Sequence, residues 1–166
     1  MDSTVYISLI IVGGLIVFGI AVSRLNQLKK KKEHQKVMND FDEFVIQNNL
    51  TIDKKEKLNR NMIGIDRLNL KLVFLDNSIT PPQFHLINLQ ELSACRMLQH
   101  ENRANSHIST IFLKCIFKQK NKPDILLPFY NEMSDDLFKM MRLSKQAAHW
   151  EKSINIYRES AAVLTN

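Results

Sequence analysis

The sequence has 166 residues and a formal net charge of +6, from 23 Lys and Arg against 17 Asp and Glu. Beyond residue 36 about 130 residues remain, enough for one compact domain with its own core and too few for two. Residues 24–36 carry six basic groups and one acid, whereas residues 37–166 carry seventeen basic and fifteen acidic groups. Because the larger part is nearly neutral, the composition argues against a nucleic-acid-binding protein.

Residues 5–22, VYISLIIVGGLIVFGIAV, contain no charged residue. With Thr4 and Ser23 the run reaches about 20 residues, the length of helix that crosses a hydrocarbon core of about 30 Å. A cleaved signal peptide is disfavoured, because residues 1–4 are acidic to neutral and the basic cluster follows the apolar run. We therefore predict a single transmembrane helix in residues 1–23. Gly19 and Ser23 form a small-xxx-small pair that would let two such helices approach, so self-association stays open.

Basic residues follow the apolar run and none precedes it. They flank the predicted anchor at Arg24, Lys29, Lys30, Lys31, Lys32 and Lys36. An excess of Lys and Arg marks the cytoplasmic side of a membrane helix. The chain is thus predicted to sit in the inner (plasma) membrane, N-terminus outside and C-terminal domain in the cytoplasm. The tract would also attract anionic headgroups, by about 1 kcal/mol per basic residue.

Residues 24–50 are predicted to form a basic helical stalk. Its second half has apolar residues at Val37, Phe41, Phe44 and Val45, which lie on one face of a helix. That face should dock on the following domain, and Asn48 and Asn49 should end the helix. Residues 51–56 are expected to form a turn or a short helical entry.

Short strands are predicted from residue 61 onward. Residues 62–66 and 70–76 predict a hairpin, with Asn69 available for a strained turn position. Residues 84–98 have strand signals at both ends around 88–91, and then fade into a polar loop. The clearest half-buried strand is 108–118, in which one face carries Ile111, Leu113, Cys115 and Phe117.

The last predicted strand, residues 124–130, contains Pro128, which implies an edge position or a bulge. A long amphipathic helix should follow, with Ser134 as N-cap and Asp135 and Asp136 in its first turn. Its apolar residues recur at spacings of three and four, at Leu137, Met140, Leu143, Ala147, Trp150, Ile154, Tyr157 and Ala161. We expect this stripe to face the core, with Trp150 as the main plug.

This order of short strands followed by one helix resembles a pleckstrin-homology-like (PH-like) domain, and most closely the bacterial PH-like domains that sit behind a membrane helix. The resemblance covers about residues 58–157. It is carried by IGID at 63–66 before the LKLVFL strand, INL at 87–89 leading into LSAC at 92–95, IFL at 111–113, LPFY at 127–130 and AAHW at 147–150. The resemblance implies a PH-like antiparallel β-sandwich or barrel capped by a C-terminal helix, which we place at 51–161. With the transmembrane anchor at 1–23, the helical stalk at 24–50 and a tail at 162–166, we expect an α+β chain.

The resemblance implies binding and scaffolding. The first hypothesis is a membrane-tethered module that holds a protein partner, or a second copy of itself, at the inner face of the membrane. The second is an anionic-lipid-binding domain that uses the stalk and the first hairpin. Phosphoinositide-binding PH domains share a basic motif around that hairpin. Its nearest equivalents here are Arg60, Arg67 and Lys71, and Asp66 interrupts them. The near-neutral domain favours the first hypothesis.

No catalytic arrangement stands out, and we predict neither an enzyme nor a cofactor. A Gly-rich phosphate loop, HExxH and GxSxG are missing from the sequence. Cys95 and Cys115 lack CxxC spacing, and core packing as free thiols is the expected role. A zinc site of these cysteines with His100 and His107 fits no common finger spacing.

Overall fold

The computed structural model describes the backbone of residues 3–102 and 107–163. It describes the side chains of the same residues except 3–21, 26, 30 and 161–163. The chain divides into two compact units, Met1–Asn39 and Asp40–Asn166. Helix α1 (Ser3–Gln47) begins in the first unit and ends in the second. The unit boundary thus falls earlier than the predicted domain boundary at residue 51, because the last turns of α1 belong with the folded domain.

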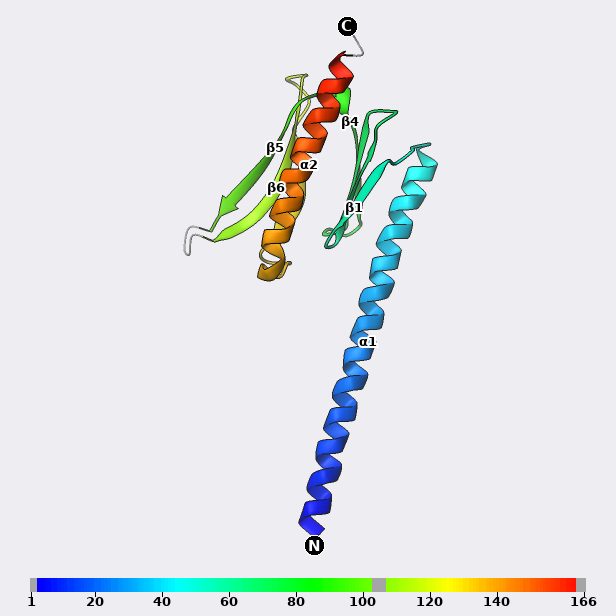
Figure 1. Ribbon diagram of the computed structural model, residues 1–166, viewed down its shortest axis with the longest axis vertical. Helices are drawn as coiled ribbons and strands as arrows, with labels where there is room; N and C mark the ends of the chain where they lie inside the picture. Colours follow the sequence, from blue (N-terminus) through cyan, green and yellow to red (C-terminus); the bar gives the residue numbers. More distant parts are fainter. Residues whose placement is uncertain (1–2, 103–106, 164–166) are drawn as a thin grey trace. The chain divides into compact units, whose positions relative to one another are not determined.

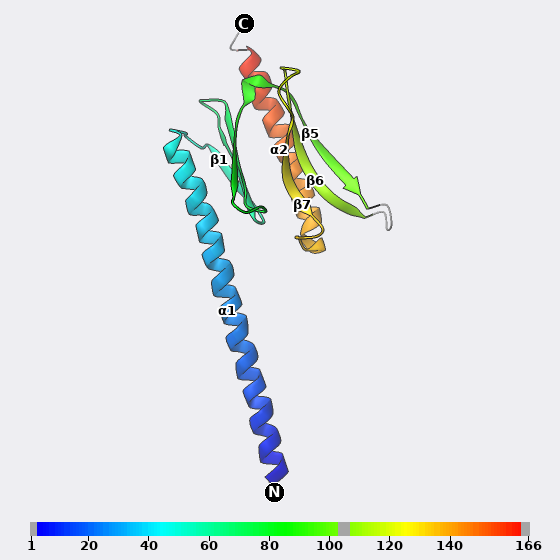
Figure 2. The same cartoon turned by 180° about the vertical axis from the view of Figure 1, so that it is seen from behind.

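The second unit contains two antiparallel sheets and a C-terminal helix (Figures 1 and 2). The first sheet has the order β1 (Lys54–Leu58), β2 (Asn61–Asp66), β3 (Lys71–Asp76) and β4 (Gln83–Asn88). A 3-10 turn, η1 (Leu89–Glu91), leads to the second sheet, of β5 (Leu92–Glu101), β6 (Ile108–Phe117) and β7 (Ile125–Asn131). Helix α2 (Leu137–Val163) follows. The predicted α+β class, with antiparallel strands before a closing helix, is confirmed.

One hydrophobic core joins the two sheets and α2. From α2 it receives four fully buried side chains, Leu143, Ala147, Trp150 and Ile154, with Met140 and Tyr157 packed against it. The inward residues of β6 alternate with half-buried ones as predicted. Most of the expected stripe on α2 is thus confirmed, but Leu137 is 58% exposed, and Ala161 lies outside the residues with described side chains.

The outer face of the first sheet is covered as well. Every residue of β2 is buried, a pattern that requires packing on both faces of the sheet. The last turns of α1 provide this cover: Phe41 is fully buried, and Phe44 stacks on Phe84 of β4 with ring centroids 4.2 Å apart. A Cβ added to Gly64 would lie 2.8 Å from the Phe41 ring. The predicted docking of the second half of the stalk is confirmed for these residues.

Three local predictions were wrong. Residues 54–58 form the edge strand β1 where we expected a turn or helical entry, because pairing with β2 overrides the low strand propensity of KKEKL. Strand β5 continues to Glu101, beyond the predicted end at residue 98. In the β2–β3 turn the positive φ, 52°, belongs to Leu70 and not to Asn69.

The start of α2 also differs from the prediction. The helix begins at Leu137, so Asp135 and Asp136 precede it. Asp136 accepts the backbone N–H of Phe138 at 3.2 Å, whereas Asp135 accepts the N–H of Asn131 at 2.9 Å. The helix-start role expected of Ser134 therefore falls to Asp136. In β7, by contrast, Pro128 lies on an edge strand at an irregularity of register with β6, as predicted.

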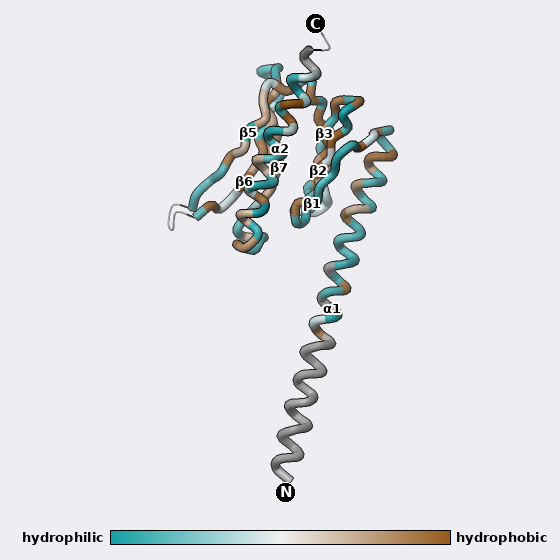
Figure 3. The backbone as a smooth tube through the Cα atoms, viewed as in Figure 1, coloured by the Kyte–Doolittle hydropathy of each residue, from teal (hydrophilic) through white to brown (hydrophobic). Residues whose placement is uncertain are grey.

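The predicted anchor lies almost wholly outside the residues that the structure describes fully, so the structure does not test it. Among the residues that the structure describes fully, no helix is long and apolar enough to cross a membrane. Residues 1–21 of the predicted span lie outside that set. From residue 22 onward the first unit is mostly hydrophilic with scattered apolar residues (Figure 3), among them the exposed Leu25 and Leu28. The membrane span therefore stays a prediction.

The carboxylate of Asp66 holds the β2–β3 turn together. It is fully buried and accepts the backbone N–H groups of Thr51 (2.8 Å) and Asn69 (2.9 Å) and the side-chain amide of Asn69 (2.8 Å). Burial raises the pKa of this carboxyl, but the hydrogen bonds outweigh burial and hold it below the usual 3.8. Asp66 is thus a structural anion, and this explains why it interrupts the basic residues of the first hairpin.

Acid should weaken the fold through Asp66. Because its folded-state pKa is lowered, the ionised carboxylate stabilises the protein above the unfolded pKa, and this contribution is lost as the pH falls through the folded pKa. We expect Asp66→Asn to lower the free energy of unfolding by about 1–2 kcal/mol at neutral pH. The difference from the unchanged chain should narrow below pH 3.8. Urea denaturation at several pH values measures it, and a difference independent of pH would contradict this role.

Candidate functional site

A groove of about 670 Å³ lies where strand β1 meets helix α2. Its volume falls within the range of about 300–1,000 Å³ that ligand-binding clefts occupy. It is lined by Glu56 of β1 and by Phe138, Met141, Arg142, Lys145, Gln146 and His149 of α2. These residues belong to the folded unit of residues 40–166, so the groove is part of the domain itself.

The groove exposes apolar side chains on the helix face that faces away from the core. Phe138, Met141 or Arg142, Lys145 and His149 recur every three or four residues, so they share one side of α2. Phe138 is 93% exposed and Met141 is 67% exposed. Two large apolar side chains held in water beside a groove are typical of an interaction surface.

The inner wall of the groove is polar and tightly bonded. The carboxylate of Glu56 accepts a hydrogen bond from the Gln146 side-chain amide and another from the indole N–H of Trp150, each at 2.6 Å. Trp150 is fully buried, so these bonds fasten the centre of α2 to β1. The side-chain oxygen of Gln146 is buried and has no hydrogen-bond partner within the described part of the chain.

The rim of the groove is basic. Arg142 and Lys145 are exposed, and neither takes part in a salt bridge among the described residues. Lys54 of β1 contacts the imidazole of His149, and its ammonium lies 5.0 Å from the centre of the Trp150 ring. The one acid of the lining, Glu56, is already occupied by Gln146 and Trp150, so the open side of the groove presents positive charge.

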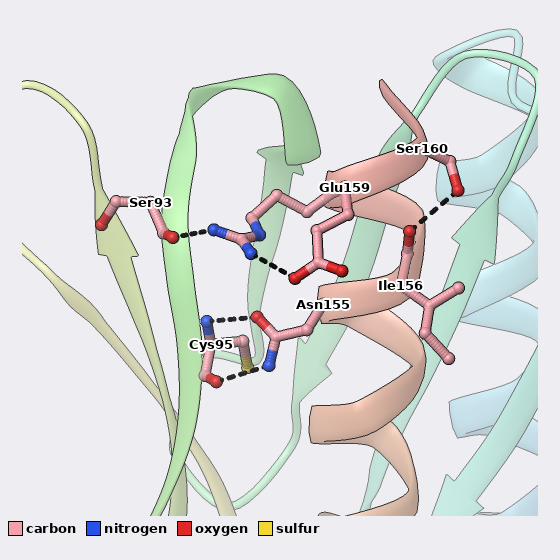
Figure 4. A network of polar contacts seen from close by, with 7 residues as sticks. Ser93, Cys95, Asn155, Ile156, Glu159 and Ser160 are labelled. Atoms are coloured by element: carbon pink, nitrogen blue, oxygen red, sulfur yellow. Dashed lines mark hydrogen bonds and ion pairs between the residues drawn. The ribbon is translucent and has the colours of Figure 1, made fainter. Parts of the chain in front are cut away.

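The opposite side of α2 closes the edge of β5 (Figure 4). The Asn155 amide accepts the backbone N–H of Cys95 at 3.0 Å and donates to its carbonyl at 2.8 Å. Glu151 accepts the N–H of Met97 at 3.1 Å, and Arg158 donates to the carbonyl of Ser93. An added strand would have to bond to these same main-chain groups of β5, and the side chains of α2 already occupy them. The side of α2 that faces β1 therefore remains the more accessible one.

A second cavity is much smaller. It encloses about 50 Å³ between the β1–β2 turn and the segment before α2, with Asn59, Asn61, Tyr130 and Asp135 among its lining. A water molecule takes up about 30 Å³ of liquid, so the cavity has room for one or two waters. It is a polar seam of the fold and has no space for a larger ligand.

The structure does not bring Arg60, Arg67 and Lys71 together. Arg60 lies in the turn before β2 and Arg67 in the turn after it, so the strand separates them by about 20 Å. Lys71 opens β3 at the Arg67 end, opposite Asp66. The Arg67 guanidinium lies 5.2 Å from the Tyr157 ring centre, in a cation–π contact. A phosphate site shared by all three residues therefore has no geometric support.

The basic residues predicted to flank the anchor all lie on α1. Arg24, Lys29, Lys31, Lys32 and Lys36 are exposed, and the side chain of Lys30 lies outside the described residues. The helix runs through this tract without a break up to Gln47. The predicted helical stalk is thereby confirmed as a helix for its described part.

Cys95 and Cys115 face each other across β5 and β6 as buried free thiols. A hydrogen bond with Cys115, together with burial, raises the pKa of Cys95 well above its usual value. The thiolate is the form that binds metals and attacks substrates, so Cys95 is held in its unreactive thiol form. Among the described residues no group of three or more His, Cys, Asp or Glu side chains could hold a metal ion, so the zinc alternative gains no support.

Sequence reasoning missed the groove because it assigned one packed stripe to α2 and a solvated face opposite. The available signal was the pairing of Leu137 with Phe138 and of Met140 with Met141. One helix face cannot bury both members of such pairs, so one of each had to stay outside the stripe. Glu56 was missed because β1 was not predicted as a strand.

Comparisons of the chain with protein-family models, with curated proteins and with solved structures found no match.

Proposed function

We propose that this protein is a single-pass membrane protein that presents a cytoplasmic PH-like domain as an interaction or scaffolding module. The observation that carries the proposal is the groove between β1 and α2, with exposed Phe138 and Met141 above a polar wall. Its lining holds no nucleophile paired with a base, so binding without chemistry suits it best.

The membrane part of the proposal rests on the sequence. Residues 5–22 are uncharged and long enough to span a bilayer, and six basic residues follow them. Helix α1 runs without a break from Ser3 to Gln47, and Phe41 and Phe44 near its end pack on the first sheet within the folded unit. A tether of this kind would keep the domain close to the membrane surface.

The PH-like assignment is supported by the order of the elements. Four antiparallel strands form one sheet, the next three form a second sheet, and a single helix follows and contributes Trp150 to the shared core. This is the arrangement that the resemblance implied. The α1 turns on the outer face of the first sheet are an addition to the expected sandwich.

The alternative, an anionic-lipid-binding domain using the stalk and the first hairpin, has less support. Arg60, Arg67 and Lys71 are dispersed over both ends of β2, and Arg67 is engaged with Tyr157. The exposed basic residues of α1 retain a general attraction to anionic headgroups.

The membrane tether is tested by charging the apolar run. We expect the full chain to remain in the membrane fraction after alkaline carbonate washing. Val12→Asp with Leu15→Asp should release most of it, because each acid at a helix centre costs about 2.5–3.5 kcal/mol on insertion. The matched control, Leu25→Asp with Leu28→Asp, changes two apolar residues outside the run and should stay in the membrane. Release of the unchanged chain by carbonate would contradict the tether.

A further inference from the structure

We infer that the groove between β1 and α2 binds an acidic amphipathic segment of a partner protein, whose apolar side chains contact Phe138 and Met141 while its carboxylates pair with Arg142 and Lys145. This inference deepens the proposed function, and it rests on it in one respect: the partner is met at the membrane. The size of the groove, its charge and its polar wall each point to this occupant.

The apolar part of the groove fits side chains of a helix or short peptide. Phe138 and Met141 are about one turn apart on α2, and both are largely exposed. They can therefore contact two apolar side chains of a bound segment that are three or four residues apart. The groove volume of about 670 Å³ is large enough for several such side chains. Aromatic and Met residues are also enriched in protein interfaces and at adaptable binding surfaces.

The charge around the groove selects an acidic partner. Arg142 and Lys145 line it and have no salt bridge among the described residues, while the carboxylate of Glu56 is bonded to Gln146 and Trp150. A basic segment would be repelled by Arg142 and Lys145, because no acidic side chain neutralises them, and this repulsion would lower its affinity. An acidic segment would supply the missing partners.

The polar wall favours a protein over a lipid surface. The lining includes the Glu56 carboxylate and the Gln146 side-chain amide, which are hydrogen-bonded to each other. A peptide has backbone N–H and C=O groups that suit a polar wall, whereas the acyl region of a bilayer has none. We therefore assign the groove to a protein segment and make lipid an outcome of the test.

The test uses the full chain with a photo-crosslinking amino acid in place of Phe138, in native membranes. A matched position is Leu68, which is 80% exposed in the β2–β3 turn and lies outside the groove. We expect a crosslink from position 138, and not from 68, to a segment that mass spectrometry maps as acidic and amphipathic. Arg142→Glu with Lys145→Glu should reduce the yield at least about tenfold. Lys118→Glu with Lys120→Glu, an equal change of charge at exposed sites outside the groove, should not.

The other outcomes overturn the assignment. Crosslinking of lipid from position 138 would make this face a membrane contact, and crosslinking of a basic or uncharged segment would remove the charge argument. No crosslink from position 138 would show that the groove is empty in the native membrane. Crosslinking of a partner from position 68 alone would contradict the assignment of the groove as the binding site. It would still agree with a membrane-tethered interaction module. The tether fails separately, in the carbonate experiment, so the two failures can be distinguished.

Discussion

Replacing Trp150 by Ala is expected to lower the free energy of unfolding by about 3–5 kcal/mol, at the upper end of what a single substitution in a core costs. Its ring is fully buried in the core that α2 shares with both sheets. Its indole N–H donates to Glu56 at 2.6 Å, so the change also removes one of the two bonds that fasten α2 to β1. A domain with a typical stability of about 5–15 kcal/mol would be close to unfolding.

Urea denaturation of the full chain in mild detergent, followed by circular dichroism, measures this effect. Phe138→Ala is the matched control, because it truncates an aromatic side chain on the same helix that is 93% exposed. We expect that change to stay within about 0.5 kcal/mol. Trp150→Phe should fall between the two, since it keeps most of the ring and loses the N–H. Equal destabilisation by Trp150→Ala and Phe138→Ala would mean that the two faces of α2 are wrongly assigned.

The core face of the fold could be predicted from the sequence because burial follows periodicity. The alternation of Ile111, Leu113 and Cys115 marked one face of β6, and the spacing of Leu143, Ala147 and Trp150 marked one face of α2. In each case hydrophobic burial dominates the free energy of folding, and the spacing of apolar residues in the sequence shows which face is buried. Pro128 could be placed at an edge for a similar reason, since it lacks a ladder donor.

The edge strand β1 could not be predicted in this way. Its sequence, KKEKL, has no apolar alternation, and it becomes a strand because the backbone of β2 offers it hydrogen bonds. Pairing of this kind depends on tertiary structure and leaves no local pattern. The candidate groove depends on β1 through Glu56, so it was out of reach for the same reason.

The phosphate hypothesis had a different weakness. Arg60, Arg67 and Lys71 are close in sequence, but a strand of six residues carries the chain about 20 Å between the first two. Residues that are close in sequence are also close in space within a turn or on one face of a helix. Residues at the two ends of a strand are far apart. The turn residue was misjudged too: Asn69 is held by Asp66 through its amide, and the positive φ passes to Leu70.

Replacing Gly64 by Val is expected to destabilise the domain by about 1–3 kcal/mol, through overpacking against α1. A Cβ at this position would lie 2.8 Å from the end of the Phe41 ring and 3.2 Å from Ile52. Phe41 is fully buried, so its ring has little room to move away. Valine is by itself the better strand residue, and this preference opposes the expected loss by up to about 1 kcal/mol. We expect the cost of overpacking to exceed this gain in strand preference.

The size of the effect should depend on Phe41, and this makes the prediction sharp. In a Phe41→Ala background the 2.8 Å clash with the Phe41 ring is removed and only the 3.2 Å contact with Ile52 remains. The loss caused by Gly64→Val should therefore shrink or vanish, because strand propensity and cavity filling then favour valine. Urea denaturation of the four chains gives the coupling energy. Limited proteolysis near Asn49, where α1 has ended, should rise in the Gly64→Val chain if the helix turns undock. An equal loss in both backgrounds would mean that Phe41 does not pack on Gly64, and the docking of the last turns of α1 on the first sheet would be refuted with it.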